Sequence, residues 1–380
     1  MSYLVLAYFA LGSWLAYDRN MHVALLADTA WIADELAMFK FLVVGLMDEQ
    51  VRVAQVVPLQ MADRQASTFV DLVAWRDTRF EWIRRQRLGS LAFALQELRI
   101  QVVHALDGRL WQGALRLADR LGVPALLSAT SYQDGARAKT IRRQLASNRA
   151  VFAAATEPLA ESIRQRQIDP AMVHVVPLGA HIPAQQDRRD NPSTLCVVIT
   201  GNGVFDSQYQ ALLESLAELV REHPEMLLFL DSQGADEHQL WQAVRRYGLL
   251  SHMSMIPNHV SHRELLMGAH VLIQPQSLGR ARGLTLQAMA YGLPVLARQD
   301  PWLDYLVDNQ TAWITEQADA DTWIALIRRT VENRQDARRL GESARNWIRE
   351  HHLAADQVER TLTLYRQLVG ETYKFKPQGG

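Results

Sequence analysis

The sequence predicts an α/β fold made of two domains, each a doubly wound parallel sheet with helices on both faces. The first observation is length, because 380 residues exceed one ordinary domain and suit two. The second is that short, continuous apolar runs alternate with helical patterns, which is typical of parallel βαβ units. The third is a polar, proline-bounded stretch at 183–193, PAQQDRRDNPS, after which the alternation starts again.

Each expected strand is a short apolar run, and each expected helix repeats its apolar residues at helical spacing. Before the polar stretch, strands are expected at 22–27, 51–57, 102–105, 124–127, 150–155 and 173–176. Helices in the same part are expected at 31–46, 71–98, 110–121 and 158–165.

After the polar stretch the same two patterns continue to the end of the chain. Strands are expected at 195–200, 226–231, 253–256, 271–274 and 294–297. Helices are expected at 208–222, 238–247, 262–267 and 284–291, and two helix-rich segments at 318–350 and 353–369.

The first residues stand apart, because 3–17 form an uncharged and mostly apolar run. The run is shorter than the roughly 20 residues of a transmembrane helix, and no basic region precedes it as in a secretory signal. Two interpretations stay open. Either the native start is Met21, whose MHVALLAD is typical of an opening strand, or the run lies on a membrane surface.

These patterns predict five segments along the chain. They are an apolar extension at 1–20, an N-terminal domain at 21–182, a C-terminal domain at 183–351, a last helix within 352–370 and a tail at 371–380. Ligands of doubly wound sheets bind beyond the carboxyl ends of the strands. The cleft between the two domains is therefore the expected site.

Composition excludes several classes of protein. Acidic and basic residues number 41 and 40, so the net charge is −1 and no nucleic-acid partner is expected. Cys196 is the single cysteine, which excludes a disulfide framework and a multi-cysteine zinc site. His259 and His262 lack neighbouring carboxylate or thiolate ligands, so neither a metal nor a cofactor is expected. We expect a cytoplasmic protein and leave a peripheral contact with the inner membrane face open.

Three strings in the C-terminal half carry a family resemblance. They are VLIQPQ at 271–276, GRARGLTLQAMAYGLPVLA at 279–297 and DPWLDYLVDNQTAWI at 300–314. They resemble the donor-binding half of the GT-B glycosyltransferases, in particular the retaining family 4, the glycosyl transferases group 1. In the N-terminal half, MHVALLAD at 21–28, the stretch 102–130 and VHVVPLGAHIP at 173–183 are similar to that family as well.

The resemblance implies a GT-B fold, in which two Rossmann-like domains face each other across a cleft. It implies that the N-terminal domain takes the acceptor, that the C-terminal domain takes the donor, and that the last helix returns to the N-terminal domain. The activity implied is transfer of a sugar from a UDP- or GDP-linked donor to a glycan or lipid-linked acceptor in envelope or exopolysaccharide synthesis. It also implies that donor oxygens assist the acceptor, so no general base is expected and no catalytic residue is assigned.

The first donor-site motif of the family is altered in this chain. The family pattern G-R-x-x-x-K-G corresponds to GNGVFDSQY at 201–209, which has neither cation. Gly201 and Gly203 remain candidates for donor binding, because their backbone N–H groups can approach a phosphate. The alternative is a tight strand-to-helix turn. Asp206 is unfavourable for an anionic donor and is a candidate N-cap of the next helix.

The two glutamates of the family are replaced as well. The first corresponds to Gly279, and the second, which holds the ribose in the family, corresponds to Gln287, whose amide can still bind hydroxyls. Arg280 and Arg282 precede the helix at 284–291 and are candidates for binding the donor diphosphate. The alternative is that both arginines are solvated loop residues.

On the acceptor side the candidates are His104 and Arg109, in the string VHALDGR that ends a strand. A buried structural histidine is the alternative for His104. The glycine pair of the family's first loop is replaced by Ala33 and Asp34 or their neighbours. Its histidine after the fifth strand is replaced by Ser131-Tyr132-Gln133.

Two basic stretches suit an anionic membrane surface or simply a solvated helix face. They contain Arg76, Arg79, Arg84, Arg85 and Arg87, followed by Arg137, Lys139, Arg142, Arg143 and Arg149.

Two functions from different classes stay open after these observations. One is an active glycosyltransferase. The other is a catalytically inactive relative that binds a glycan, a nucleotide or a partner transferase, because the charged donor residues of the family pattern are substituted. A nucleotide-sugar epimerase lacks a supporting acid or base cluster in this sequence.

Overall fold

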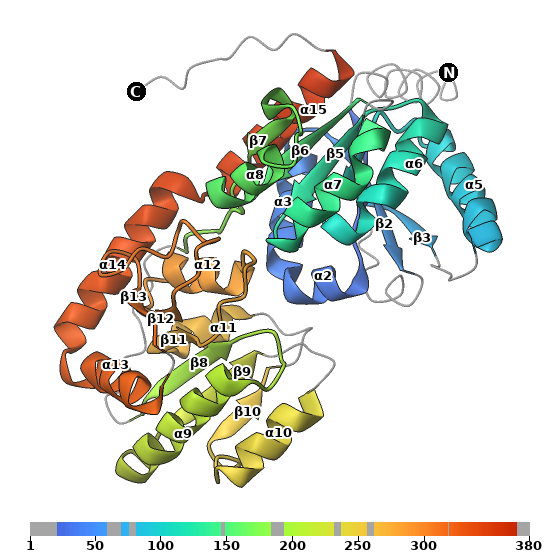
Figure 1. Ribbon diagram of the computed structural model, residues 1–380. Helices are drawn as coiled ribbons and strands as arrows, with labels where there is room; N and C mark the ends of the chain where they lie inside the picture. Colours follow the sequence, from blue (N-terminus) through green and yellow to red (C-terminus); the bar gives the residue numbers. More distant parts are fainter. Residues whose placement is uncertain are drawn as a thin grey trace, which may run out of the picture.

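The computed structural model describes residues 21–58, 70–75, 81–145, 149–183, 194–231, 237–256, 262–317 and 319–370. Our predictions for 1–20, for nearly all of the polar stretch at 183–193 and for the tail at 371–380 lie outside these residues. The predicted architecture is confirmed: two parallel sheets are flanked by helices, and each sheet belongs to one half of the molecule (Figure 1).

The sheet of the N-terminal half has the order β3-β2-β1-β4-β5-β6-β7. Its strands are β1 (His22–Leu26), β2 (Arg52–Pro58), β3 (Asp71–Trp75), β4 (Val102–Ala105), β5 (Ala125–Ala129), β6 (Ala150–Ala154) and β7 (Val173–Val175). The helices are α2 (Thr29–Asp34), α3 (Leu36–Asp48), α5 (Glu81–Glu97), α6 (Trp111–Leu121), α7 (Gln133–Leu145) and α8 (Glu157–Arg164). The strand order reverses between β1 and β4, so a crevice is expected beyond the ends of these two strands.

The sheet of the C-terminal half has the order β10-β9-β8-β11-β12-β13 and reverses between β8 and β11. Its strands are β8 (Cys196–Thr200), β9 (Leu227–Asp231), β10 (Met253–Met255), β11 (Val271–Gln274), β12 (Val295–Arg298) and β13 (Trp313–Thr315). The helices are α9 (Ser207–Glu222), α10 (Glu237–Arg246), α11 (His262–Gly268), α12 (Gly283–Ala290), α13 (Ala320–Glu332) and α14 (Arg334–His351).

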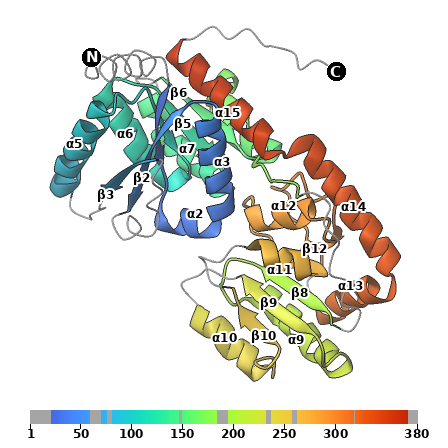
Figure 2. The same cartoon turned by 180° about the vertical axis from the view of Figure 1, so that it is seen from behind.

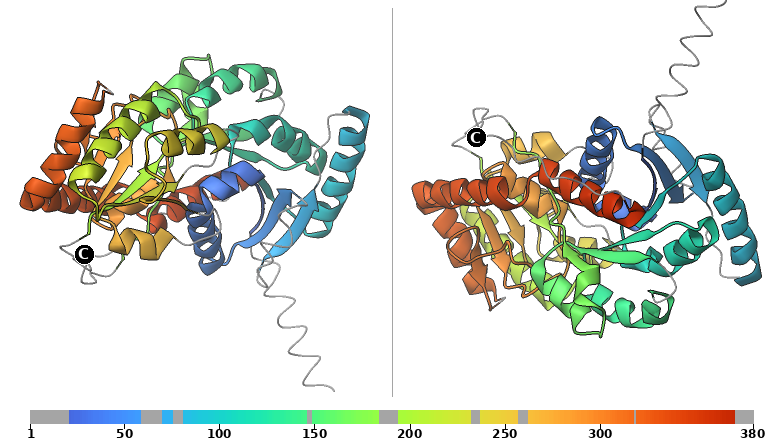
Figure 3. Two further views of the ribbon diagram at one scale, coloured as in Figure 1. Left: turned by 90° about the horizontal axis from the view of Figure 1, so that it is seen from below. Right: turned by 90° about the horizontal axis from the view of Figure 1, so that it is seen from above.

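Burial explains why the short apolar runs form central strands. Every residue of β1, β4, β8 and β11 is buried, as expected for parallel strands that helices cover on both faces. Figure 2 and Figure 3 show these helices on the two sides of each sheet. The C-terminal helix α15 (Ala354–Val369) lies against α3, and its Val358, Leu362 and Tyr365 join the core of the N-terminal half.

Two element predictions are wrong, and two further elements were not predicted. The stretch 71–98 is not one helix, because 71–75 forms the edge strand β3 and α5 begins at Glu81. The helix expected at 31–46 is two helices, which are separated at Glu35, where φ is −123°. The short strand β13 and the helix α7 were not predicted, since α7 buries few apolar residues among its basic ones.

Among the described residues, no helix combines the length and the apolar character that a bilayer crossing requires.

Candidate functional site

The carboxyl ends of the second sheet meet at the side chain of Arg282. This residue is the N-cap of α12, and its side chain is 2% exposed. Its Nη2 lies 3.0 Å from Oδ2 of Asp231, the last residue of β9, and 3.4 Å from Oγ1 of Thr200, the last residue of β8. The strand ends therefore hold a buried cation in front of a helix N-terminus, which is the geometry of an anion site.

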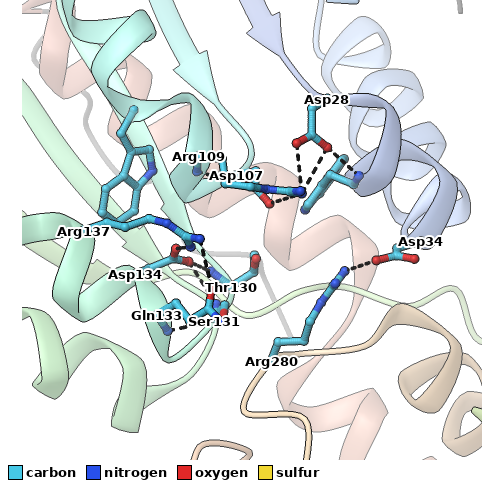
Figure 4. A network of polar contacts seen from close by, with 12 residues as sticks. Asp28, Asp34, Asp107, Arg109, Thr130, Ser131, Gln133, Asp134, Arg137 and Arg280 are labelled. Atoms are coloured by element: carbon cyan, nitrogen blue, oxygen red, sulfur yellow. Dashed lines mark hydrogen bonds and ion pairs between the residues drawn. The ribbon is translucent and has the colours of Figure 1, made fainter. Parts of the chain in front are cut away.

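Two acids of the N-terminal half reach the same place. Asp34 Oδ2 lies 2.5 Å from Nη2 of Arg280 and 3.5 Å from Nη1 of Arg282. Glu35 Oε2 accepts the backbone N–H of Gly283, the first residue of α12, at 2.7 Å. Figure 4 shows Asp34 and Arg280 pointing toward each other from opposite halves.

The loop before α12, residues 279–282, is bonded to protein groups along its length. The N–H of Gly279 is donated to Asp300 Oδ2 at 2.7 Å, and the N–H of Ala281 to the carbonyl of Thr130 at 2.9 Å. The carbonyl of Gly279 accepts the N–H of Tyr132 at 2.7 Å. The two halves are thus joined by backbone hydrogen bonds at the loop where the family places its first glutamate.

Burial and charge set the protonation states in this site. Burial raises the pKa of Glu35 to about 7, because it outweighs the opposing effect of Arg282 and Arg280. Burial alone would lower the pKa of Arg282, but Asp231, Asp34 and Glu35 raise it above the ordinary arginine value. Arg282 is therefore a permanent cation, whereas Glu35 titrates near neutral pH.

Several buried polar atoms here have no hydrogen-bond partner among the described residues. They are Tyr209 Oη, His262 Nε2, Gln274 Nε2, Arg282 Nε and Glu35 Oε1. Buried polar atoms are nearly always satisfied in folded proteins. A cluster of unsatisfied donors and acceptors at the ends of a parallel sheet is what a polar ligand would complete.

The glycines of the first donor motif lie at the switch point between β8 and β11. Gly203 has φ +73°, which favours glycine. A Cβ at Gly201 would collide with the Tyr209 hydroxyl, so packing also requires glycine there. Asp206 caps α9 by accepting the N–H groups of Gln208 and Tyr209, as its candidate role predicted.

Gln276 organises this turn and was not singled out by the sequence analysis. Its Oε1 accepts the N–H of Asn202 at 3.0 Å, and its Nε2 donates to Asp206 Oδ2 at 2.7 Å. Gln287 is buried on α12, one helical turn after Gly283. The signal for Gln276 was its place two residues after the buried strand β11, because ligand-binding residues of such sheets lie beyond the strand ends.

The acceptor-side candidates take different positions. His104 is buried, with Nδ1 2.6 Å from Tyr365 Oη and Nε2 2.8 Å from Ser128 Oγ. Burial lowers the pKa of His104 to about 3, so its ring is neutral. Arg109 is 44% exposed and joins Asp107, at 2.8 Å, to Asp28, at 2.9 Å (Figure 4). Asp107 and Asp28 lie two residues after the ends of β4 and β1, at the switch point of the first sheet.

Asp134 fixes the loop that meets residues 279–282. Its Oδ2 accepts the N–H groups of Thr130 and Ser131, both at 3.0 Å, and its Oδ1 lies 2.7 Å from Nη1 of Arg137 (Figure 4). The sequence did not point to Asp134, Glu35 or Asp231, because most of their partners are remote in sequence or are backbone amides.

Comparisons with known proteins add to this geometry. Residues 184–347 match the family model described as glycosyl transferases group 1. The uncharacterized glycosyltransferase YqgM of Bacillus subtilis is 23% identical over 288 residues, which are 72% of this chain and 80% of that protein. The MMP alpha-(1->4)-mannosyltransferase of Mycolicibacterium hassiacum is 24% identical over 209 residues, 53% of this chain and half of that protein.

Among solved structures, Anabaena Alr3699/HepE in complex with UDP and glucose is similar to this chain with a TM-score of 0.73 and 10% identity. The match covers 92% of this chain and 100% of that one. At this identity the likeness concerns the fold alone, and it extends over both sheets.

Proposed function

We propose that this chain transfers a sugar from a nucleoside-diphosphate donor to a glycan or lipid-linked acceptor, because it has the GT-B fold and its residues 184–347 match the glycosyl transferases group 1 model. The fold and the family resemblance that the sequence predicted are thereby confirmed. The main support for a diphosphate-containing donor is Arg282, because it is a permanent cation at the start of α12 and at the ends of β8 and β9.

We assign the donor site to Gly201, Gly203, Arg280, Arg282 and Gln287. As the glycosidic bond breaks, negative charge grows on the departing diphosphate, and aimed cations and N–H groups stabilise that charge. Arg280 and Arg282 supply the cations in this proposal. Gln287 would bind ribose hydroxyls through its amide, without the charge of the family glutamate.

The donor nucleotide is UDP or GDP in this proposal. The similar HepE structure holds UDP and glucose, and one relative is named a mannosyltransferase, so UDP-glucose and a GDP-linked mannose are the first donors to test.

We assign the acceptor side to Arg109, with His104 as a positioning residue. Arg109 is half exposed at the switch point of the first sheet, where a bound sugar would meet its guanidinium and the carboxylates of Asp28 and Asp107. The two ring nitrogens of His104 contact Ser128 and Tyr365 inside the core. His104 would therefore position the strand that carries it and would not touch the acceptor.

We propose that the acceptor belongs to envelope or exopolysaccharide synthesis and that the protein works in the cytoplasm, against an anionic membrane. The exposed residues Lys139, Arg142 and Arg143 on α7 support that contact. Sedimentation with anionic vesicles tests it, and binding unchanged in a Lys139→Glu/Arg143→Glu variant would remove α7 from the contact.

One observation favours the inactive alternative. Arg280, Arg282 and the backbone groups of the loop before α12 are already paired with protein groups. The match to a transferase family and to named transferases does not favour it, so the active enzyme remains our proposal.

Calorimetry with UDP, GDP, UDP-glucose and GDP-mannose tests the proposed function. We expect micromolar binding of one nucleotide and its sugar, and release of that nucleotide when the sugar donor is incubated with the protein. Absence of binding to all of these ligands at millimolar concentration would contradict the proposal and favour the inactive alternative.

A further inference from the structure

We propose that the acidic pair, Asp34 and Glu35, occupies the donor site in place of a diphosphate and holds the two halves together until the donor displaces it. The inference rests on the proposed function, because it concerns the same site. It adds a regulatory contact to that site, in which the acidic pair competes with the donor for the same cations and N–H group.

The acidic pair uses the groups that a diphosphate would need. Asp34 Oδ2 is within 2.5 Å of Arg280 Nη2 and 3.5 Å of Arg282 Nη1. Glu35 Oε2 accepts the N–H of Gly283 at the N-terminus of α12. Adjacent carboxylates on two arginines and a helix N-terminus resemble two adjacent phosphates on the same donors.

The charges of the site make simultaneous occupancy unfavourable. The guanidinium groups of Arg280 and Arg282 already face the carboxylates of Asp34, Glu35 and Asp231. A diphosphate would bring further negative charge next to these buried acids, and like charges at such distances repel strongly. Binding therefore requires that the acidic pair leave.

Glu35 is bound less completely than the structural acid Asp134. Asp134 satisfies both oxygens, one with two backbone N–H groups and one with Arg137. Glu35 uses only Oε2, since Oε1 has no hydrogen-bond partner among the described residues and lies 3.8 Å from Arg280. Arg282 Nε is likewise buried without such a partner. A diphosphate oxygen can accept the hydrogen bond that Arg282 Nε leaves unused, and Glu35 Oε1 can be solvated once the acidic pair has left, which makes the exchange favourable.

The short helix α2 connects the acidic pair to the acceptor side. Asp28 caps its N-terminus by accepting the N–H of Trp31 at 2.7 Å, and Arg109 holds the same carboxylate. Asp34 ends the helix and binds Arg280 (Figure 4). Displacement of Asp34 by a donor would therefore act on the helix whose other end meets the acceptor candidate Arg109.

The test compares calorimetric binding of UDP and of inorganic pyrophosphate to three proteins. They are the wild type, Asp34→Asn/Glu35→Gln, and the matched control Asp48→Asn/Glu49→Gln, which changes an exposed acidic pair at the other end of α3.

We expect the variant Asp34→Asn/Glu35→Gln to bind UDP about tenfold or more tightly than the wild type, and the control to bind as the wild type does. Where the wild type binds UDP, equal or weaker binding by Asp34→Asn/Glu35→Gln would overturn the inference. If that variant does not fold, Glu35→Gln alone, which keeps the Asp34 ion pairs, is expected to change the affinity in the same direction.

A second measurement separates this inference from the proposed function. Amide hydrogen exchange of Ala281 and Gly283 is measured without ligand in the same three proteins. If no protein binds any nucleotide, the proposed function fails, and the contact between the halves is judged by exchange alone. Faster exchange in Asp34→Asn/Glu35→Gln than in the control supports the contact, and equal exchange overturns it.

Discussion

The guanidinium group of Arg282 connects two strand ends, a helix N-terminus and the opposite half of the molecule. Its partner Asp231 is buried as well, so removal of the arginine would take a cation away from a buried carboxylate, which would keep its hydrogen bond from Thr200 Oγ1. Arg280 makes a similar ion pair with Asp34, but its side chain is 28% exposed. The two arginines are neighbours in sequence and differ in burial, which gives a matched pair for experiment.

We expect Arg282→Ala to lower the free energy of unfolding by about 3–5 kcal/mol, the cost of breaking one side of a buried ion pair. Arg280→Ala should lower it by about 0–1 kcal/mol, as for a partly exposed pair. Urea denaturation of the two variants measures the difference. Equal losses would show that Arg282 is not held as the structure indicates.

Glu35 should make stability depend on pH near neutrality. Burial raises its folded-state pKa from 4.5 to about 7 against the opposing effect of Arg282 and Arg280, while Asp34 and Tyr305 also face it. An acid with a raised pKa binds more protons when folded, so its stabilising contribution is complete below about 4.5 and is lost as pH rises through 7.

The wild type should therefore lose up to about 3 kcal/mol relative to Glu35→Gln between pH 5 and pH 8. Unfolding free energies of both proteins at the two pH values measure this, and contributions of other groups cancel in the difference. A difference between the proteins that does not change with pH would contradict the raised pKa of the buried Glu35 carboxyl.

At the scale of elements, the loop before α12 is shaped by its contact with the N-terminal half. Gly279 has φ +59°, and a Cβ there would collide with the ring of Tyr132. Tyr132 in turn lies against Trp302, with ring centroids 6.0 Å apart. A glutamate at 279, as in the family, does not fit this arrangement of the loop.

Substitution of Gly279 by alanine should cost about 1–2 kcal/mol for its positive φ and about 1–3 kcal/mol more for the collision. Gly122→Ala is the matched control, since Gly122 has φ +68° and open space around its Cβ position. In a Tyr132→Ala background the second contribution should disappear. Equal costs at Gly279 and Gly122 in the wild-type background would mean that Tyr132 does not close this loop.

Much of the element order could be predicted because buried parallel strands are continuous apolar runs. β4 and β11 lie where their apolar runs predicted, whereas the edge strand β3 has no fully buried residue and resembled the start of a helix. Arg280 and Arg282 were found from their place before an apolar helix. Their partner carboxylates were not, because Glu35 lies 248 residues before Gly283 and only the fold brings them together.

At the scale of the whole molecule, two of the contacts between the halves lie near the candidate site. One is the loop before α12, which contacts Thr130, Tyr132 and the acidic pair. The other joins Thr156 to the carbonyl of Trp302 and the N–H of Glu157 to Asp304. α15 then packs on α3, the helix that begins directly after Glu35. The acidic pair therefore lies between two features: the loop before α12, which it contacts, and α3, on which α15 packs.

The central claim is that a nucleoside diphosphate binds at the start of α12, where the acidic pair now lies. A crystal structure of the protein with bound UDP tests it most directly. We predict diphosphate oxygens within hydrogen-bond distance of Arg282 and the Gly283 N–H, with Asp34 and Glu35 moved away. Diphosphate bound elsewhere, with the acidic pair still on these groups, would contradict the claim.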